Sequence, residues 1–208
     1  SYRVRKKDCL DLPEKMYVQR YVDMPDEQRQ AYERLRLTAI MVMKDEEVSY
    51  NNKLTELLKL QQVANGFIKT NEGNIVDFKT NAKLKELMCI IEETQDKCII
   101  WANYVHNIEA IKKKLAETYG VDSVVSIYGK DSVDVRNQAV EKFQNNEECR
   151  FLVGNPTVGG YGLTLTAAKY VIYYSNSYNL EVRQQSEDRA HRIGQKSQVT
   201  YIDIICRD

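Results

Sequence analysis

The sequence predicts an α/β fold, a parallel sheet with helices on both faces, preceded by a helical protrusion. From about residue 82 onward, short apolar runs alternate with stretches whose apolar residues have helical spacing. These runs are nearly continuous, which is typical of strands buried on both faces of a parallel sheet. Between residues 25 and 67 only helical spacing is present.

The predicted protrusion contains two helices. "PDEQRQAYERLRLTAIMVM" begins with Pro25 and acidic residues, which favour a helix start. "NKLTELLKLQQVANGF" ends in Asn65 and Gly66, a helix-stop signal. The polar stretch that follows, "IKTNEGNIVDFKTN", contains Gly73 and is predicted to be a loop.

Strands and helices then alternate along the rest of the chain. We expect helices at residues 83–93, 106–120, 131–146 and 181–193. We expect strands at residues 97–103, 123–129, 149–155, 169–175 and 198–206. Ligands of such sheets bind beyond the carboxyl ends of the strands, so we expect the loops that carry chemistry to gather at that edge.

The first candidate loop is "GNPTVGGYGLTLTAA", residues 154–168, which follows a predicted strand. It contains four glycines in nine residues: Gly154, Gly159, Gly160 and Gly162. Glycine allows close approach of the backbone, and clustered N–H groups can hold a phosphate. A connection shaped only by packing explains the composition equally well. A dinucleotide-binding loop is rejected, because Leu165 stands where its third glycine belongs.

The second candidate loop places Gly129, Lys130, Asp131 and Ser132 at the start of a predicted helix. Helix N-termini attract anions, and Lys130 and Ser132 are suited to a nucleic-acid phosphate. Simple capping of the helix by Asp131 or Ser132 is the alternative.

The third candidate is "EDRAHRIGQ", residues 187–195. On a helix, Gln185, Arg189 and Arg192 would share one face, since they are four and three residues apart. The planar guanidinium suits phosphate oxygens, and Asp188 could tether one of the arginines. A solvated helix end with ion pairs is the alternative, and His191 is interpreted as a packing or hydrogen-bonding residue.

Composition excludes several classes of protein. The net charge is zero, so the chain has no overall positive field that would attract nucleic acid. No apolar stretch approaches the ~20 residues that span a bilayer. The basic start is followed by "DCLDLPEK", which is not the apolar core of a secretory signal. The five cysteines form no C-x-x-C pair and there are only two histidines, which argues against a zinc site or a disulfide framework. We therefore expect reduced, buried thiols in an intracellular protein.

Taken together, the motifs resemble those of Swi/Snf-type ATPases, the translocase branch of the superfamily two helicases. "QSEDRAHRIGQ" resembles their motif VI, Q-x-x-D-R-x-H-R-x-G-Q, with matches at Gln185, Asp188, Arg189, His191, Arg192, Gly194 and Gln195. "GGYGLTLTAA" resembles motif V, with matches at Gly159, Gly160, Gly162, Leu163, Leu165, Thr166 and Ala168.

The resemblance extends over nearly the whole chain. "KCIIWANYVHNIEAI" resembles motif IV, "YGKDSVDVRNQAVEKFQ" resembles the block after it, and "RKKDCLDLPEK" resembles the connector that enters the second lobe. It implies a connector at residues 1–24, a helical protrusion at 25–80 and a RecA-like helicase C-terminal lobe at 81–208.

The chain departs from the family pattern at a few positions. Thr164 replaces the usual asparagine of motif V, and Asn155-Pro156-Thr157 replaces a Ser-Thr-Lys-like start. The insertion of chromatin remodellers is not evident, which favours a bacterial or phage-like, cytoplasmic member, or a nuclear one if the source is eukaryotic. No G-x-x-x-x-G-K-[ST] occurs, and the acidic clusters at 26–28 and 45–47 sit in helical patterns.

The resemblance implies the second motor lobe of a DNA-dependent ATPase that translocates on double-stranded DNA. ATP and Mg²⁺ would be held mainly by a first RecA-like lobe of the same polypeptide, absent here, so this lobe alone would be inactive. Arg189 and Arg192 would be the catalytic arginine fingers. The implied nucleotide-binding residues are Gln185, Gly160, Gly162, Thr164 and Asp188, and the implied DNA-binding residues are Gly129, Lys130, Ser132, Asn155 and Thr157.

Two other functions are considered. One is a stand-alone lobe that binds DNA or a protein without catalysis. The other is a small-molecule α/β enzyme that uses the glycines at 159–162, which would need a Cys–His or Ser–His dyad that the sequence does not support.

Overall fold

The computed structural model describes residues 12–44, 49–70 and 72–207. The chain forms two compact units. Of the described residues, the first unit contains 12–20 and 90–204, and the second contains 21–44, 49–70, 72–89 and 205–207.

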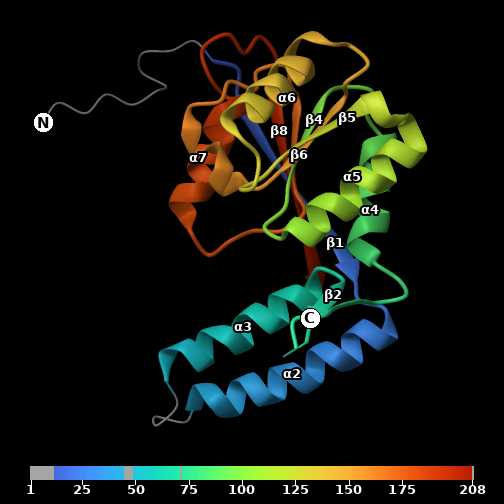
Figure 1. Ribbon diagram of the computed structural model, residues 1–208, viewed down its shortest axis with the longest axis vertical. Coiled ribbons are helices and arrows are strands. Elements are labelled where there is room, and N and C mark those ends of the chain that lie inside the picture. Colours follow the sequence, from blue (N-terminus) through green and yellow to red (C-terminus); the bar gives the residue numbers. More distant parts are fainter. Residues whose placement is uncertain (1–11, 45–48, 71, 208) are drawn as a thin grey trace, which may run out of the picture. The chain divides into compact units, whose positions relative to one another are not determined.

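The first unit is built on a six-stranded sheet with the order β1-β8-β7-β4-β6-β5 (Figure 1). Its strands are β1 (Lys15–Asp23), β4 (Cys98–Trp101), β5 (Val124–Ile127), β6 (Phe151–Gly154), β7 (Tyr170–Tyr173) and β8 (Val199–Arg207). The pairings of β8 with β7, β7 with β4, β4 with β6 and β6 with β5 are all parallel. This confirms the predicted α/β fold and each of the strands predicted after residue 97.

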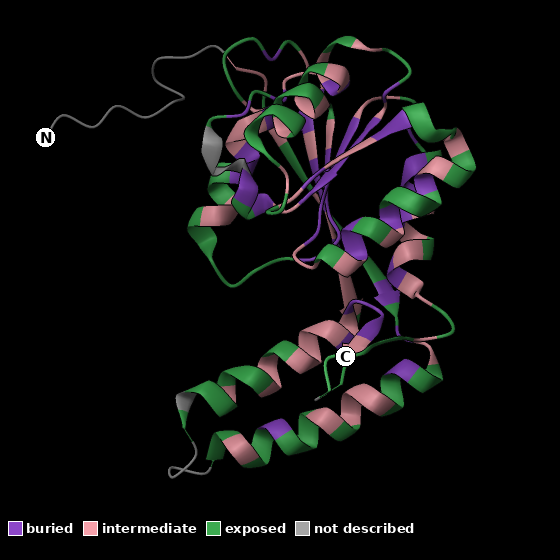
Figure 2. Ribbon diagram, viewed as in Figure 1, coloured by how far each residue is buried: buried purple, intermediate pink, exposed green. Residues whose placement is uncertain are grey.

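Helices pack on both faces of this sheet. They are α5 (Val105–Tyr119), α6 (Val133–Asn145) and α7 (Leu180–Ala190), and Figure 1 shows α5 on one side of the sheet and α6 and α7 on the other. Two short 3-10 helices, η1 (Val121–Ser123) and η2 (Pro156–Tyr161), lie in the connections. Strands β4 and β6 are buried at every residue and β7 at all but its first, and Figure 2 shows this buried centre of the sheet. The continuous apolar runs therefore arise from burial on both faces.

Gly154 is required where β6 ends. A Cβ atom built there would lie 2.6 Å from Ile127 Cγ1 and 2.7 Å from the Ile127 carbonyl oxygen of β5. Because backbone cannot move aside cheaply, only glycine lets the strands pair at this point. This supports packing as the role of this glycine of the candidate loop.

The second unit contains the predicted helical hairpin. Helix α2 (Asp26–Lys44) lies beside α3 (Tyr50–Ala64), and α4 (Ala82–Glu92) begins in this unit. Ser49 caps α3 by accepting from the N–H of Asn52, and Gly66 ends it with φ +90°. The predicted helix-stop signal is confirmed.

One prediction about local structure is wrong, and one strand was not predicted. The segment predicted as a loop after Gly66 contains an antiparallel hairpin, β2 (Phe67–Lys69) and β3 (Ile75–Asp77). Each strand has three residues, too few to show an alternating pattern. Strand β1 lies within the predicted connector, and most of its residues are half-buried or exposed, so it carries no continuous apolar run.

The expectation of buried thiols holds in part. Cys98 and Cys149 are buried, whereas Cys206 is half-buried and Cys89 is exposed on α4. Cys9 and the acidic cluster at 45–47 lie outside the described residues. No helix in the described ranges combines the length and the apolar character needed to cross a membrane.

Candidate functional site: the arginine pocket and two loops

Helix α7 ends earlier than predicted, and this separates the two candidate arginines. Its last residue is Ala190, and His191 leaves the helical conformation with φ −93° and ψ 78°. Arg189 therefore lies in the last turn, whereas Arg192 lies in the turn that follows. The expectation that Arg192 shares a helical face with Gln185 and Arg189 is wrong, because the chain reverses here, with Gly194 at φ +100°.

Gln195 fixes this reversal. Its side-chain amide nitrogen donates to the carbonyl oxygens of Thr166, Ala168 and Ala190 at 3.0, 3.0 and 3.2 Å. Its side-chain oxygen accepts from the N–H of Ser197 at 3.0 Å. The residue is buried, so the amide satisfies carbonyl groups that water does not reach. The last glutamine of the motif thus ties the end of α7 to the segment that leads into β7.

The two arginines line one pocket of about 310 Å³. Its lining residues are Leu12, Gly162, Asp188, Arg189, His191, Arg192 and Ile193. One guanidinium nitrogen of Arg192 donates to the Gly162 carbonyl oxygen at 3.1 Å and lies 3.4 Å from the Thr164 hydroxyl. Gly162 has φ +70°, a conformation that glycine adopts without strain. Motifs V and VI therefore meet at this pocket.

The surroundings of Arg189 combine burial with a second positive charge. Its buried Nε has no hydrogen-bond partner among the described residues. Burial and the positive charge of Arg192 lower the pKa of its guanidinium, and Asp188 opposes this change. Two neighbouring cations and a donor without an acceptor together favour a ligand with several negatively charged oxygens.

The other predicted nucleotide contacts are placed less uniformly. Asp188 lines the pocket, and its carboxylate lies 3.9 Å from the Lys15 ammonium. Gly160 lies in η2. Gln185 is exposed and donates to Glu181 at 2.9 Å, so it is not part of the pocket lining.

The two predicted DNA loops follow neighbouring strands. Gly129 and Lys130 are exposed beyond the carboxyl end of β5. Ser132 caps α6, its hydroxyl accepting from the N–H of Val135 at 3.3 Å. The capping alternative thus describes this serine, and Asp131 instead accepts from the N–H of Tyr128 at 2.7 Å. The groups left for a ligand here are the exposed backbone and the Lys130 amine.

Asn155 and Thr157 form the corresponding turn after β6. The Asn155 side-chain oxygen accepts from the N–H and the hydroxyl of Thr157 at 2.9 and 2.6 Å. Its amide nitrogen donates to the Asn103 carbonyl oxygen, just after β4, at 2.9 Å. Because β5 pairs with β6, this turn and the Lys130 loop lie at the same edge of the sheet.

The arginine pocket lies near the opposite ends of the strands. Gln195 bonds to Ala168, two residues before β7 begins, whereas Asn155 bonds to the residue two positions after β4 ends. The expectation that all the candidate loops gather at the carboxyl ends is therefore wrong for the arginines. The segment from η2 to β7 joins the two regions, which suits two different ligands.

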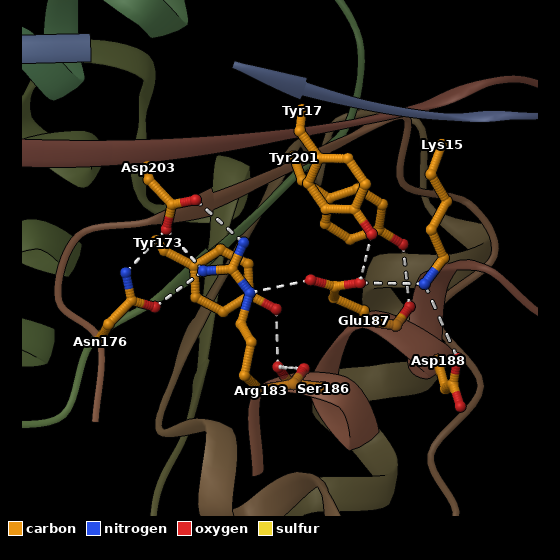
Figure 3. Close-up of polar contacts among 10 residues, drawn as sticks. All are labelled: Lys15, Tyr17, Tyr173, Asn176, Arg183, Ser186, Glu187, Asp188, Tyr201 and Asp203. Atoms are coloured by element: carbon orange, nitrogen blue, oxygen red, sulfur yellow. Dashed lines mark hydrogen bonds and ion pairs between the residues drawn. The ribbon is translucent and has the colours of Figure 1, made fainter. Parts of the chain in front are cut away.

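A charged cluster beside the pocket, in which Glu187 is buried and Arg183 and Asp203 are partly buried, was not predicted (Figure 3). Arg183 donates to both carboxylate oxygens of Asp203, at 2.5 and 3.0 Å, and to Glu187 at 2.9 Å. Its guanidinium lies 3.4 Å from the centre of the Tyr173 ring. The spacing of Arg183 and Glu187 by four residues was the one available signal, since the remaining partners come from distant strands.

Comparison with known proteins identifies related chains. Residues 80–194 match the helicase conserved C-terminal domain family. The chain is 30% identical over 210 residues to an uncharacterized ATP-dependent helicase, MG018, of Mycoplasma genitalium, covering 99% of this chain and 20% of that protein. It is 31% identical over 199 residues to the putative ATP-dependent helicase/translocase YwqA of Bacillus subtilis, covering 90% and 21%. The chain thus spans about a fifth of the length of these relatives.

Solved structures show the same fold. The SWI2/SNF2 ATPase core of Sulfolobus solfataricus in complex with double-stranded DNA superposes with a TM-score of 0.77 at 28% identity. The match covers 94% of this chain and 42% of that one.

Proposed function

This chain belongs to the helicase conserved C-terminal domain family, as the C-terminal lobe of a SWI2/SNF2-type ATPase, and from this premise we propose that it is one half of a motor that moves on double-stranded DNA. In this proposal residues 1–24 connect it to a first lobe, 25–80 form a protrusion and 81–208 form the RecA-like motor lobe. The observation that carries the proposal is the pocket in which Arg189 and Arg192 meet the Gly162 segment.

The pocket residues fit the phosphate end of ATP. ATP would supply the γ-phosphoryl group that is transferred to water. Arg189 and Arg192 would offer their guanidinium donors to the charge that develops on this group, and the Gly162 carbonyl and Thr164 would hold Arg192 in place. No group of three or more His, Cys, Asp or Glu side chains in the described ranges is arranged to hold a metal ion. In this proposal Mg²⁺ is held mainly by residues of the first lobe.

The loops beyond the carboxyl ends of β5 and β6 would contact DNA. The exposed Gly129 backbone and the Lys130 amine offer donors without any arrangement for reading bases. The turn at Asn155 and Thr157, whose donors bond within the chain, would lie beside the same DNA backbone. Such contacts to phosphates fix position without sequence information, and they weaken as salt rises. With the nucleotide at one region and DNA at the other, a change in the η2–β7 segment would couple hydrolysis to movement.

The chain alone is expected to hydrolyse no ATP above a matched blank, because the phosphates and Mg²⁺ need the first lobe. Joined to such a lobe, it is expected to show turnover that duplex DNA stimulates. Phosphate release with and without DNA measures both. Turnover by the isolated chain that disappears in Arg192→Ala would contradict the division of labour, and DNA binding with no turnover in the joined protein would favour the stand-alone binding lobe.

Lys130→Ala is expected to weaken binding to duplex DNA of every sequence by about eightfold in ~0.1 M salt, since one released counterion is lost. The slope of log affinity against log salt should fall by about 1. Titration of the joined protein with labelled duplexes measures both. Lys142→Ala is the matched control, because it removes the same charge from a lysine paired with Asp122 at 2.7 Å. Equal losses in the two variants would refute a specific contact.

A further inference from the structure

The segment that precedes and begins β1 runs along the last turns of α7. The Pro13 carbonyl oxygen lies 2.7 Å from His191 Nε2. The Lys15 ammonium donates to Glu187 at 2.9 Å, and the Tyr17 hydroxyl donates to the same Glu187 oxygen at 2.8 Å (Figure 3). Leu12, at the start of this segment, is part of the pocket lining. A segment about 170 residues away in sequence thus contacts the end of α7 and contributes Leu12 to the arginine pocket.

Glu187 joins this segment to the helix. One of its carboxylate oxygens accepts from Lys15 and Tyr17, and the other accepts from Arg183 at 2.9 Å. Its side chain is only 10% exposed. Burial alone would raise the pKa of Glu187, but the hydrogen bonds from Lys15, Arg183 and Tyr17 outweigh it and lower the pKa. The side chain is therefore an anion at neutral pH and holds three donors at once.

The position of Glu187 controls the turn that carries the arginines. Its carbonyl oxygen accepts from the N–H of His191 and from the Tyr201 hydroxyl, each at 3.0 Å. Arg189 is two residues further along the same turn. Displacement of Glu187 would therefore shift both Arg189 and the cap at which the chain turns toward Arg192.

We propose that Lys15 and Tyr17 are positioning residues that hold the last turn of α7, through Glu187, in the arrangement in which Arg189 and Arg192 face the same ligand. The catalytic consequence rests on the proposed function. In a protein with a first lobe before residue 12, the segment around Lys15 would connect the two lobes. A movement of this segment would displace Glu187 through Lys15 and thereby shift the two arginines. The connector would then act in nucleotide hydrolysis as well as joining the lobes.

The first test uses the 208-residue chain without nucleotide. Lys15→Met is expected to raise amide hydrogen exchange at residues 188–192 about tenfold, since a partly buried charged hydrogen bond is lost. It should also shift the Arg189 Nε–Hε NMR resonance. Lys15→Arg, which keeps a charged donor, should restore both, and Tyr17→Phe should act in the same direction more weakly. Lys142→Met, which breaks the ion pair between α6 and Asp122 of η1, should leave both unchanged.

Wild-type exchange and an unmoved Arg189 resonance in a folded Lys15→Met chain would overturn the proposal. So would an equal change in Lys142→Met. These readouts need no ATP turnover. They therefore separate failure of the positioning role of Lys15 and Tyr17 from failure of the proposed ATPase function. Suppose that Lys15→Met alters the Arg189 resonance, but that Arg192→Ala leaves ATP turnover of the joined protein unchanged. This result would support the positioning role of Lys15 and refute the proposed ATPase function.

The second test uses the protein that joins this chain to a first lobe. Lys15→Met is expected to lower kcat about tenfold and to leave KM for ATP within about twofold, because Lys15 acts on groups that meet the developing charge. Lys15→Arg should recover kcat. A rise in KM at constant kcat, or a loss that Lys15→Arg fails to restore, would overturn the positioning role.

Discussion

Arg192→Ala is expected to lower DNA-stimulated ATP turnover about 10³-fold in the protein that joins this chain to a first lobe, the lower end of the range for arginine fingers. Arg192 is exposed and lines the pocket, and its contacts with the Gly162 carbonyl and Thr164 use only one of its guanidinium nitrogens. In the proposed function, Arg192→Ala removes guanidinium donors that would interact with the charge developing in the transition state. Steady-state phosphate release, together with the affinity for a fluorescent nucleotide, measures the effect.

Two further variants decide between a finger and a charged helix end. Arg192→Lys keeps the charge without the planar fork, so it should recover only a small part of the turnover if bidentate contact matters. Arg20→Ala is the control, since it removes an arginine that pairs with Glu93 at 2.6 Å away from the pocket. If Arg192→Ala folds normally and keeps turnover within twofold of wild type, residues 187–195 are better interpreted as a solvated helix end.

Sequence periodicity was sufficient for the elements whose residues are buried on both faces. The runs around Ile99, Leu152 and Val171 became central strands, because complete burial leaves an unbroken apolar signal. The cap at Ser132 was also one of the predicted options, because capping depends on neighbouring residues alone. Local rules therefore predicted most of the first unit.

The parts of the site that depend on distant residues were not predicted. Edge strand β1 has no continuous apolar run, so the sequence pattern did not predict the strand or the hydrogen bond between Lys15 and Glu187. The position of Arg192 depends on Gln195, whose amide bonds to carbonyl groups about 27 residues earlier in the chain. A helical wheel drawn through Arg192 could not include that turn. Motif resemblance singled out Arg189 and Arg192, which the structure brings to one pocket, and tertiary contacts determined their geometry.

Arg183 presents the largest stability effect expected in the first unit. Burial alone would lower the pKa of its guanidinium, but its bonds with Asp203 and Glu187 more than offset this and raise it. The side chains of Arg183 and Asp203 are only 18% and 17% exposed. Arg183→Met would leave the Asp203 carboxylate buried without its main cation. We expect a loss of about 3 kcal/mol in the free energy of unfolding, measured with urea at pH 7.

The double variant tests whether the loss in the free energy of unfolding comes from the unpaired Asp203 carboxylate. Asp203→Asn removes that charge, so Arg183→Met/Asp203→Asn should be more stable than the sum of the single effects predicts, by about 1 kcal/mol or more. Lys113→Met is the control, because its pair with Glu117 has the same spacing as Arg183 and Glu187 but is largely exposed, and about 0.5 kcal/mol or less is expected. Strictly additive losses would mean that Arg183 stabilises the fold mainly by packing on Tyr173. The guanidinium would then matter as a flat surface over the ring, and the anchoring of α7 would not depend on the ion pair with β8.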